Sequence, residues 1–206
     1  FVLPRADYQI LQDSWNVMGL QGTGSKDVLV QEVFVPDYRT YDVQALNDCE
    51  YAAKHRPDSP LYRIPFDLFF PGAISAATLG IAAGVVNHFA EYTGSRVTRM
   101  GVKQTQNPYH MASLGAALAD IDASCQHILN EIGDIYKLVV AGGTVTREMK
   151  YKARVNQVRA VRRAAEVFKH AGGNASRVTN PIQRTWRDLS VAMGHACNVD
   201  DPVYAA

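Results

Sequence analysis

The spacing of apolar residues divides the chain into two parts with different predicted structures. Over residues 1–36 the apolar side chains occur in short runs rich in β-branched residues, which is typical of strands. The runs predict strands at 1–4, 8–11 and 28–35. Between the last two, the segment 22–27 has the composition of a turn. The first part of the chain is therefore expected to belong to a β-structure.

Residues 37–64 are polar and contain Pro57 and Pro60, so they are predicted to link the strands to the next part of the chain. From Pro65 onward the apolar residues recur every three or four positions, which is the period of an α-helix. The first predicted helix, over 72–95, is rich in alanine and glycine. Such small residues permit close packing against other helices.

The second predicted helix has the clearest boundaries in the chain. Asn107 and Pro108 form a strong start signal, because asparagine caps helix N-termini and proline suits the first helical position. Gly142 and Gly143 mark its end, which gives a helix about 48 Å long. Its apolar residues alternate spacings of three and four, as in a heptad seam. They are Met111, Leu114, Leu118, Ile121, Cys125, Ile128, Ile132, Ile135 and Val139.

Two further helices complete the pattern. A third is predicted from about Thr146 to Gly172, and its many basic residues are expected to form a solvated or intersubunit face. Its apolar side carries Val155, Val158, Ala165 and Phe168. The start signal recurs at Asn180 and Pro181, and the fourth helix has an apolar side of Ile182, Trp186, Leu189 and Met193. The chain is therefore predicted to be mainly α, with a four-helix bundle after part of a β-domain.

The overall composition limits which binding partners and which cellular compartment are expected. Lysine plus arginine number 21 and aspartate plus glutamate 20, and this balance predicts neither a nucleic acid nor an anionic membrane as partner. No apolar run reaches the roughly 18 residues that span a bilayer. The three cysteines form no CxxC pair, so we expect reduced thiols in a cytoplasmic protein. A chain that opens in an apolar run without methionine is expected to be a fragment.

Candidate chemistry is sparse. Segment 19–26 resembles a phosphate-binding loop, but its serine precedes its lysine and a strand is predicted to follow, so we interpret it as a turn. The six histidines include no HExxH motif and no pair at i, i+4, so no metal site is predicted. His195, near the end of the last helix, is either structural or functional. Arg96 is either a partner of the helix dipole or a phosphate clamp.

Two stretches of sequence carry a family resemblance. Trp15, segment 19–25 and the Val-Phe-Val-Pro of 33–36 resemble the end of the middle β-domain in the acyl-CoA dehydrogenase superfamily. Segment 181–188, followed by His195 and Ala196, resembles the two-component flavin-dependent monooxygenases (group D) of that superfamily, closest to those that hydroxylate a secosteroid phenol. The resemblance implies the last strands of the β-domain over 1–40, a linker over 41–64 and the C-terminal helical bundle over 65–206.

The resemblance also implies an activity. Oxygenase components of this family use reduced flavin (FMN or FAD), supplied by a separate flavin reductase, to hydroxylate an aromatic, phenolic substrate with O2 through a C4a-hydroperoxyflavin. It further implies a homo-oligomer, expected to be a tetramer, and a fragment that is inactive alone. The protein's part in such chemistry is to position the reactants, exclude water and handle protons.

The same resemblance assigns site residues one by one. Arg96 matches an arginine that meets the flavin phosphate, and Gly173 and Asn174 match a pair that contacts flavin, often from a neighbouring subunit. His195 and Ala196 match the histidine–alanine pair beside the flavin ring and the substrate. His195 is the candidate catalytic residue, because an imidazole exchanges protons near neutral pH.

Two other functions stay open. Many acyl-CoA dehydrogenases place a catalytic glutamate where this chain has His195 and Ala196, and the next carboxylate here is Asp200. If the chain were an acyl-CoA dehydrogenase, it would lack the usual catalytic glutamate, although some members of the family place this base elsewhere in the sequence. The heptad seam alone would also suit a non-catalytic helical module that only oligomerises.

Overall fold

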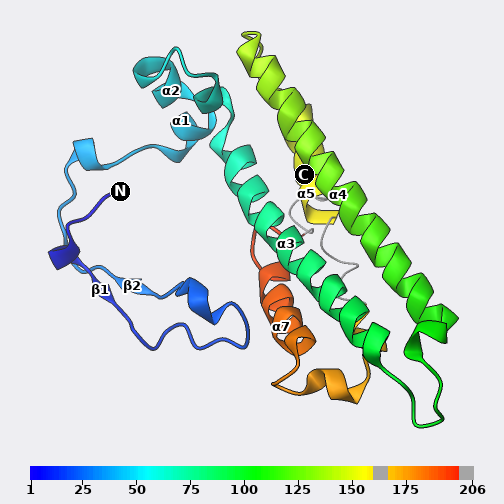
Figure 1. Cartoon of the computed structure of the whole chain (residues 1–206). Coiled ribbons are helices and arrows are strands. Elements are labelled where there is room, and N and C mark those ends of the chain that lie inside the picture. The colour runs from blue at the N-terminus through cyan, green and yellow to red at the C-terminus, as the bar shows by residue number, and fades with distance from the viewer. Residues whose placement is uncertain (160–166, 200–206) are drawn as a thin grey trace.

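The computed structural model describes residues 1–159 and 167–199 and shows a helical bundle with an extended N-terminal segment beside it (Figure 1). Two long helices run side by side, and two shorter ones pack on them. They are α3 (Phe66–Ser95), α4 (Pro108–Val140), α5 (Arg147–Arg159) and α7 (Pro181–Met193). The predicted mainly α fold is confirmed. Predictions for Ala165, Arg162, Arg163 and Asp200 lie outside the described residues.

The predicted helix boundaries are confirmed where the signal is local. The Asn107 side chain accepts hydrogen bonds from the backbone N–H groups of Tyr109 and His110 and so caps α4. The helix ends before Gly142, whose positive φ of 82° suits glycine. Asn180 caps α7 in the same way by accepting from the backbone N–H of Ile182.

The predicted heptad seam of α4 is only partly buried. Ile121, Ile128 and Ile135 face the core, but Leu118 and Ile132 are 47% and 37% exposed. The four-helix arrangement covers one side of α4, while a 3.5-residue repeat drifts around a straight helix of 3.6 residues per turn. Part of the seam therefore turns away from α3 and α5.

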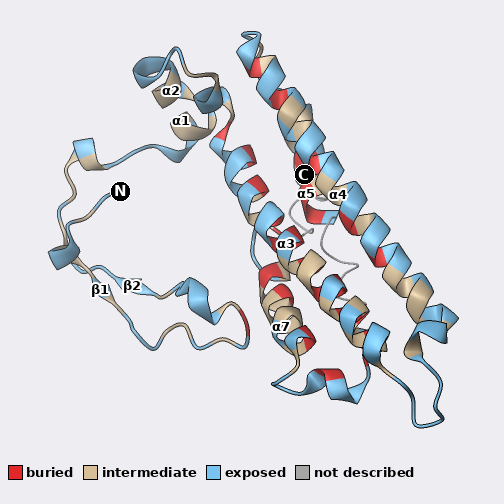
Figure 2. Cartoon of the chain, in the orientation of Figure 1, coloured by how far each residue is buried: buried red, intermediate tan, exposed pale blue. Residues whose placement is uncertain are grey.

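The core lies between the helices in two clusters (Figure 2). Phe89 is its largest fully buried side chain and belongs to the main cluster, which α3, α4 and α7 build together. The smaller cluster joins the start of α3 to the end of α4 and to α5. Its members are Leu68, Ile135, Val139, Val145 and Ala153.

Helix α3 corrects one expectation from the sequence. Among the described residues, it is the one helix that is long and apolar enough to cross a membrane by length and composition. Its scattered glycine, serine and threonine residues interrupt the apolar run, so a search for continuous apolar residues misses it. This property is weak evidence for a membrane, because the core helix of a bundle has it too. Here α3 packs against α4, α5 and α7.

The N-terminal segment contains much less strand than predicted. Only β1 (Gln9–Ile10) and β2 (Val28–Leu29) pair, antiparallel, and residues 1–4 form no strand. The predicted strand over 28–35 is wrong beyond Leu29, and Glu32 has a positive φ of 49° that breaks extended structure. The described strands form one two-stranded sheet and no closed barrel, which leaves their edges open.

The segment predicted as a linker is largely ordered into short helices. It contains α1 (Val43–Asn47), α2 (Glu50–His55) and the 3₁₀-helix η4 (Pro60–Arg63). Asp42 caps α1 by accepting from the backbone N–H of Ala45, a signal that the polar composition of the segment obscured. These helices sit at the N-terminal end of α3 (Figure 1).

One tight contact docks the N-terminal segment on the bundle. The backbone N–H of Leu20 donates to Asp188 Oδ1 at 2.7 Å, and Gly19 is buried against the backbone of Arg187. A Cβ on Gly19 would overlap the Arg187 carbonyl. Glycine at this position therefore lets the loop reach α7.

We expect Gly19→Ala to destabilise the protein by about 1–3 kcal/mol, because the added methyl group forces the loop away from α7. Leu20 would then lose its hydrogen bond to Asp188. Thermal unfolding followed by circular dichroism measures the effect. Gly22→Ala is the matched control, since a Cβ there meets nothing within 4 Å. Equal melting temperatures for the two variants would contradict this docking.

Candidate functional site

The structure brings Arg96 together with the loop that carries Gly173 and Asn174. Arg96 directly follows α3, and its Nη1 donates to the carbonyl of Ala171 at 2.6 Å. Gly172 has a positive φ of 71°, and a Cβ there would lie only 3.1 Å from Arg96 Nη1. The glycine thus leaves open the space that the guanidinium occupies.

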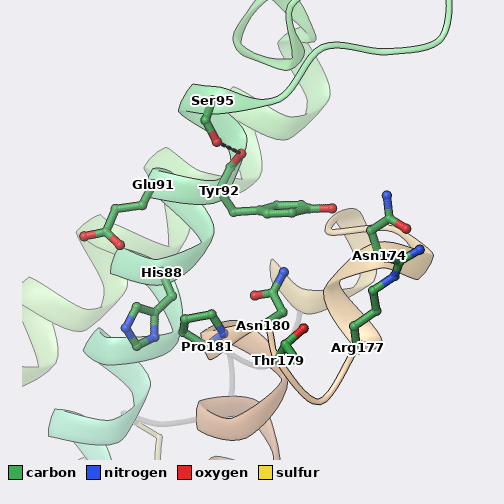
Figure 3. A pocket seen from close by; sticks show the side chains of 9 residues that line it. All are labelled: His88, Glu91, Tyr92, Ser95, Asn174, Arg177, Thr179, Asn180 and Pro181. Atoms are coloured by element: carbon green, nitrogen blue, oxygen red, sulfur yellow. Dashed lines mark hydrogen bonds between the residues drawn. The ribbon is translucent and has the colours of Figure 1, made fainter.

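A polar cleft of about 480 Å³ lies beside this contact (Figure 3). The Tyr92 ring reaches across it toward Asn174 and Arg177. The Arg96 guanidinium lies 5.1 Å from the centre of that ring. The Tyr92 hydroxyl is buried and has no hydrogen-bond partner among the described residues. A buried hydroxyl without a partner costs free energy, and it becomes a donor and acceptor for a ligand only if the cleft rearranges to expose it.

Two histidines support the cleft from the α4 side. His110 accepts at Nδ1 from the Gln104 side-chain amide at 2.7 Å, and its ring centre lies 5.4 Å from that of His170. His170 in turn contacts the Ser113 hydroxyl through Nε2 at 3.2 Å. Burial, followed by the charges of His170 and Arg96, lowers the pKa of His110. A neutral imidazole is therefore favoured next to Arg96.

His195 lies in the turn that ends α7. Its backbone N–H donates to the Ala192 carbonyl, and its own carbonyl accepts from the Asn198 N–H at 2.7 Å. The Cys197 backbone N–H donates to His195 Nδ1 at 3.1 Å. Because Nδ1 accepts this bond, the neutral ring carries its proton on Nε2. His195 and Ala196 are both exposed, so the Nε2–H group is available to a ligand.

The five predicted site residues therefore fall into two groups. Arg96 lies with Gly173 and Asn174 beyond the N-terminus of α7, whereas His195 and Ala196 follow its C-terminus. The 13 residues of α7 separate the two groups by about 20 Å. The turn with His195 lies against α3 near Ser75 and Thr78, closer to the start of α3 than to Arg96.

A third feature, which the sequence pattern did not predict, is an apolar cavity of about 570 Å³ at the N-terminal end of α3. It is the largest of the described cavities, and apolar and aromatic side chains dominate its lining. They include Leu46, Tyr51, Leu61, Tyr62, Phe66 and Phe69. His55 and Arg56 add basic groups to the same lining. The clustering of tyrosine, leucine and phenylalanine over 51–70 was the available signal.

Known proteins resemble the chain along its whole length. The family model for the acyl-CoA dehydrogenase C-terminal domain matches residues 73–199. A pigment production hydroxylase of Rhodococcus erythropolis is 39% identical, with 100% of this chain and 53% of that protein covered. The oxygenase subunit HsaA, a flavin-dependent monooxygenase of Rhodococcus jostii, is 36% identical over 99% of this chain and 55% of its own length.

Solved structures agree with these relatives. The crystal structure of the HsaA monooxygenase from M. tuberculosis superposes with a TM-score of 0.88 at 34% identity, covering 100% of this chain and 54% of that one. The chain thus spans about half the length of the relatives it matches.

Proposed function

Because the chain belongs to the family of acyl-CoA dehydrogenase C-terminal domains, we propose that it is part of the oxygenase component of a two-component flavin-dependent monooxygenase. The proposed reaction is the hydroxylation of a phenolic ring with reduced flavin and O2. The observation that carries the proposal is His195, exposed and with Nδ1 engaged by the Cys197 N–H, at the position where many dehydrogenases place a glutamate. The resemblance to hydroxylases along the whole chain supports it.

Reduced flavin, when bound, activates O2 and supplies the oxygen atom to the substrate. The residues around Arg96 fit the phosphate of such a cofactor. Among the described residues, Arg96 donates from Nη1 to the Ala171 carbonyl, and its other guanidinium N–H groups can donate to an anion. Asn174, which lines the same cleft, offers further hydrogen bonds. Because α7 separates the two groups by about 20 Å, we propose that Arg96, Gly173 and Asn174 hold the phosphate end of a flavin whose ring belongs to a neighbouring subunit, and that His195 and Ala196 face the flavin ring of their own subunit.

The aromatic cavity at the start of α3 suits the substrate. Its volume of about 570 Å³ accommodates a small aromatic molecule, and its tyrosine and phenylalanine rings supply stacking partners. Arg56 and His55 favour a phenolate or carboxylate at one end of it.

The proposed enzyme works with a flavin reductase and as a homo-oligomer, expected to be a tetramer, in the cytoplasm. Helix α4 supports the oligomer, because apolar side chains lie exposed along its outer side. They are Leu118, Leu129, Ile132, Tyr136 and Val140. A second copy of the bundle would bury such a stripe.

A reductase-coupled assay of the full-length parent protein tests the proposed function, because this chain spans about half of the relatives it matches. We expect oxygen uptake and a hydroxylated product with phenols, and no oxidation of acyl-CoA thioesters. Oxidation of a thioester would favour the dehydrogenase alternative. Absence of flavin binding in a titration of the protein would favour a non-catalytic helical module.

We expect Arg96→Met to weaken flavin binding about 10- to 100-fold, the range for loss of a charge-assisted hydrogen bond. An anaerobic titration with reduced flavin measures the dissociation constant. Arg99→Met is the control, because Arg99 is an exposed arginine in the same loop. A dissociation constant within twofold of wild type for Arg96→Met would remove this residue from the site.

Ala52 lines the aromatic cavity, and Ala52→Leu is expected to fill part of it. The added carbons should raise the dissociation constant of the phenolic substrate about 10-fold or more and leave flavin binding unchanged. Isothermal titration calorimetry with substrate and with flavin measures both constants. Lys54→Leu, on the same helix but outside the cavity lining, is the control. Unchanged substrate affinity would place the substrate elsewhere.

A further inference from the structure

The turn that carries His195 rests on a buried asparagine. Asn198 is 3% exposed, and its Nδ2 donates to the Ala192 carbonyl and to Thr78 Oγ1, both at 2.8 Å. Its Oδ1 accepts from Ser75 Oγ at 3.0 Å. The carbonyl of Ala192 can only accept, which fixes the orientation of the amide. One side chain thus ties the end of α7 to two residues of α3.

A second anchor comes from α5. Arg154 Nη2 donates to the carbonyl of Cys197 at 2.8 Å, and its Nη1 donates to Gln157 Oε1 at 2.6 Å. Gln157 is almost completely buried, so this pair holds the guanidinium in place from within the bundle. Arg154 was predicted to lie on a solvated or intersubunit face, and that prediction is wrong.

Asn198 and Arg154 both hold the backbone around Cys197, whose N–H donates to the His195 imidazole. The Cys197 residue donates its N–H to His195 Nδ1 and offers its carbonyl to Arg154, while Asn198 closes the turn onto the His195 carbonyl. Movement of this backbone would release Nδ1 and permit the other tautomer or another ring orientation. The Nε2–H of His195 therefore depends on contacts made on the opposite side of the turn.

We infer that Asn198 and Arg154 are positioning residues that hold the exposed His195 as the Nε2–H tautomer. The geometric part of this inference stands on the hydrogen bonds alone, and its effect on turnover rests on the proposed function. Neither residue touches a ligand in this arrangement. Each acts through the backbone between His195 and Asn198.

The test uses the ¹⁵N resonances of the His195 ring, which distinguish a protonated from an unprotonated ring nitrogen. In alkaline solution, where imidazoles are ordinarily neutral, we expect wild type to show proton occupancy at Nε2 alone. Asn198→Asp, Thr78→Val and Arg154→Lys should each give a mixture of tautomers. Aspartate places an oxygen against the Ala192 carbonyl, and lysine cannot make both bonds of Arg154. Lys152→Met, on the same helix as Arg154, is the control.

Turnover provides the second readout. With reduced flavin and a phenol, we expect the hydroxylated product per flavin oxidised to fall about 10- to 100-fold in these variants, with the flavin dissociation constant unchanged. Wild-type tautomer populations in the folded Thr78→Val and Arg154→Lys proteins would overturn the inference. Altered tautomers with unchanged product yield would confirm the positioning and count against a catalytic role of His195.

Discussion

Replacing His195 with asparagine should lower hydroxylation about 100- to 10,000-fold, the range for loss of a true acid or base. The asparagine Oδ1 can take the place of Nδ1 and accept from the Cys197 N–H, so the turn keeps its hydrogen bond. What is lost is the Nε2–H group. The variant therefore separates proton handling from the stability of the turn.

Two products have to be measured together in the His195→Asn protein supplied with reduced flavin. Hydroxylated product should fall and hydrogen peroxide should rise, because oxygen activation without substrate hydroxylation releases peroxide. His195→Gln is the companion variant, since its amide N–H reaches the Nε2 position but cannot exchange a proton as imidazole does. If product yield and rate both stay within about threefold of wild type, about 0.65 kcal/mol, His195 is structural.

The helices were predictable because their signals are local. Asn107 and Asn180 cap the residues that immediately follow them, and Gly142 ends α4 through its own backbone conformation. Each signal depends on a few neighbouring residues. The boundaries of α4 and α7 therefore follow from the sequence without knowledge of the tertiary structure.

The strands were not predictable in the same way. The run over 28–35 has strong β propensity, but only Val28 and Leu29 find a partner, in β1. Pairing depends on another segment at the right register, which propensity does not contain. The prediction that Leu118 is buried was wrong for a similar reason. The sequence shows an apolar stripe along α4 but does not show which side of the helix has a neighbour.

The site was predictable only in part. The family resemblance proposes Arg96 and His195 as site residues, but nothing local to the sequence marked Tyr92, Arg154 or Asn198. Their roles come from contacts between residues more than 40 positions apart, or from a buried atom left without a partner. The aromatic cavity was not predicted, because residues 37–64 are polar on average and this average hides the aromatic side chains that line the cavity.

Truncation of Phe89 to alanine is expected to have the largest effect on stability, a loss of about 3–5 kcal/mol. Phe89 is 1% exposed at the centre of the main core cluster, so its removal leaves a cavity that the surrounding helices cannot close. Domains of this size are stable by roughly 5–15 kcal/mol, so about a fifth or more of the total would be lost. Urea unfolding with a fixed slope measures the change.

Phe70→Ala is the matched control, because Phe70 lies on the same helix and is 44% exposed. It should cost about 1 kcal/mol or less, including its stacking on Phe66. The ring centres of Phe89 and His110 lie 6.3 Å apart in an edge-on contact. His110 in turn contacts His170, which lies next to Ala171, the hydrogen-bond acceptor of Arg96. We therefore expect Phe89→Ala to weaken flavin binding as well, whereas Phe70→Ala leaves it unchanged. Equal stability losses in the two variants would show that the core is not centred on Phe89.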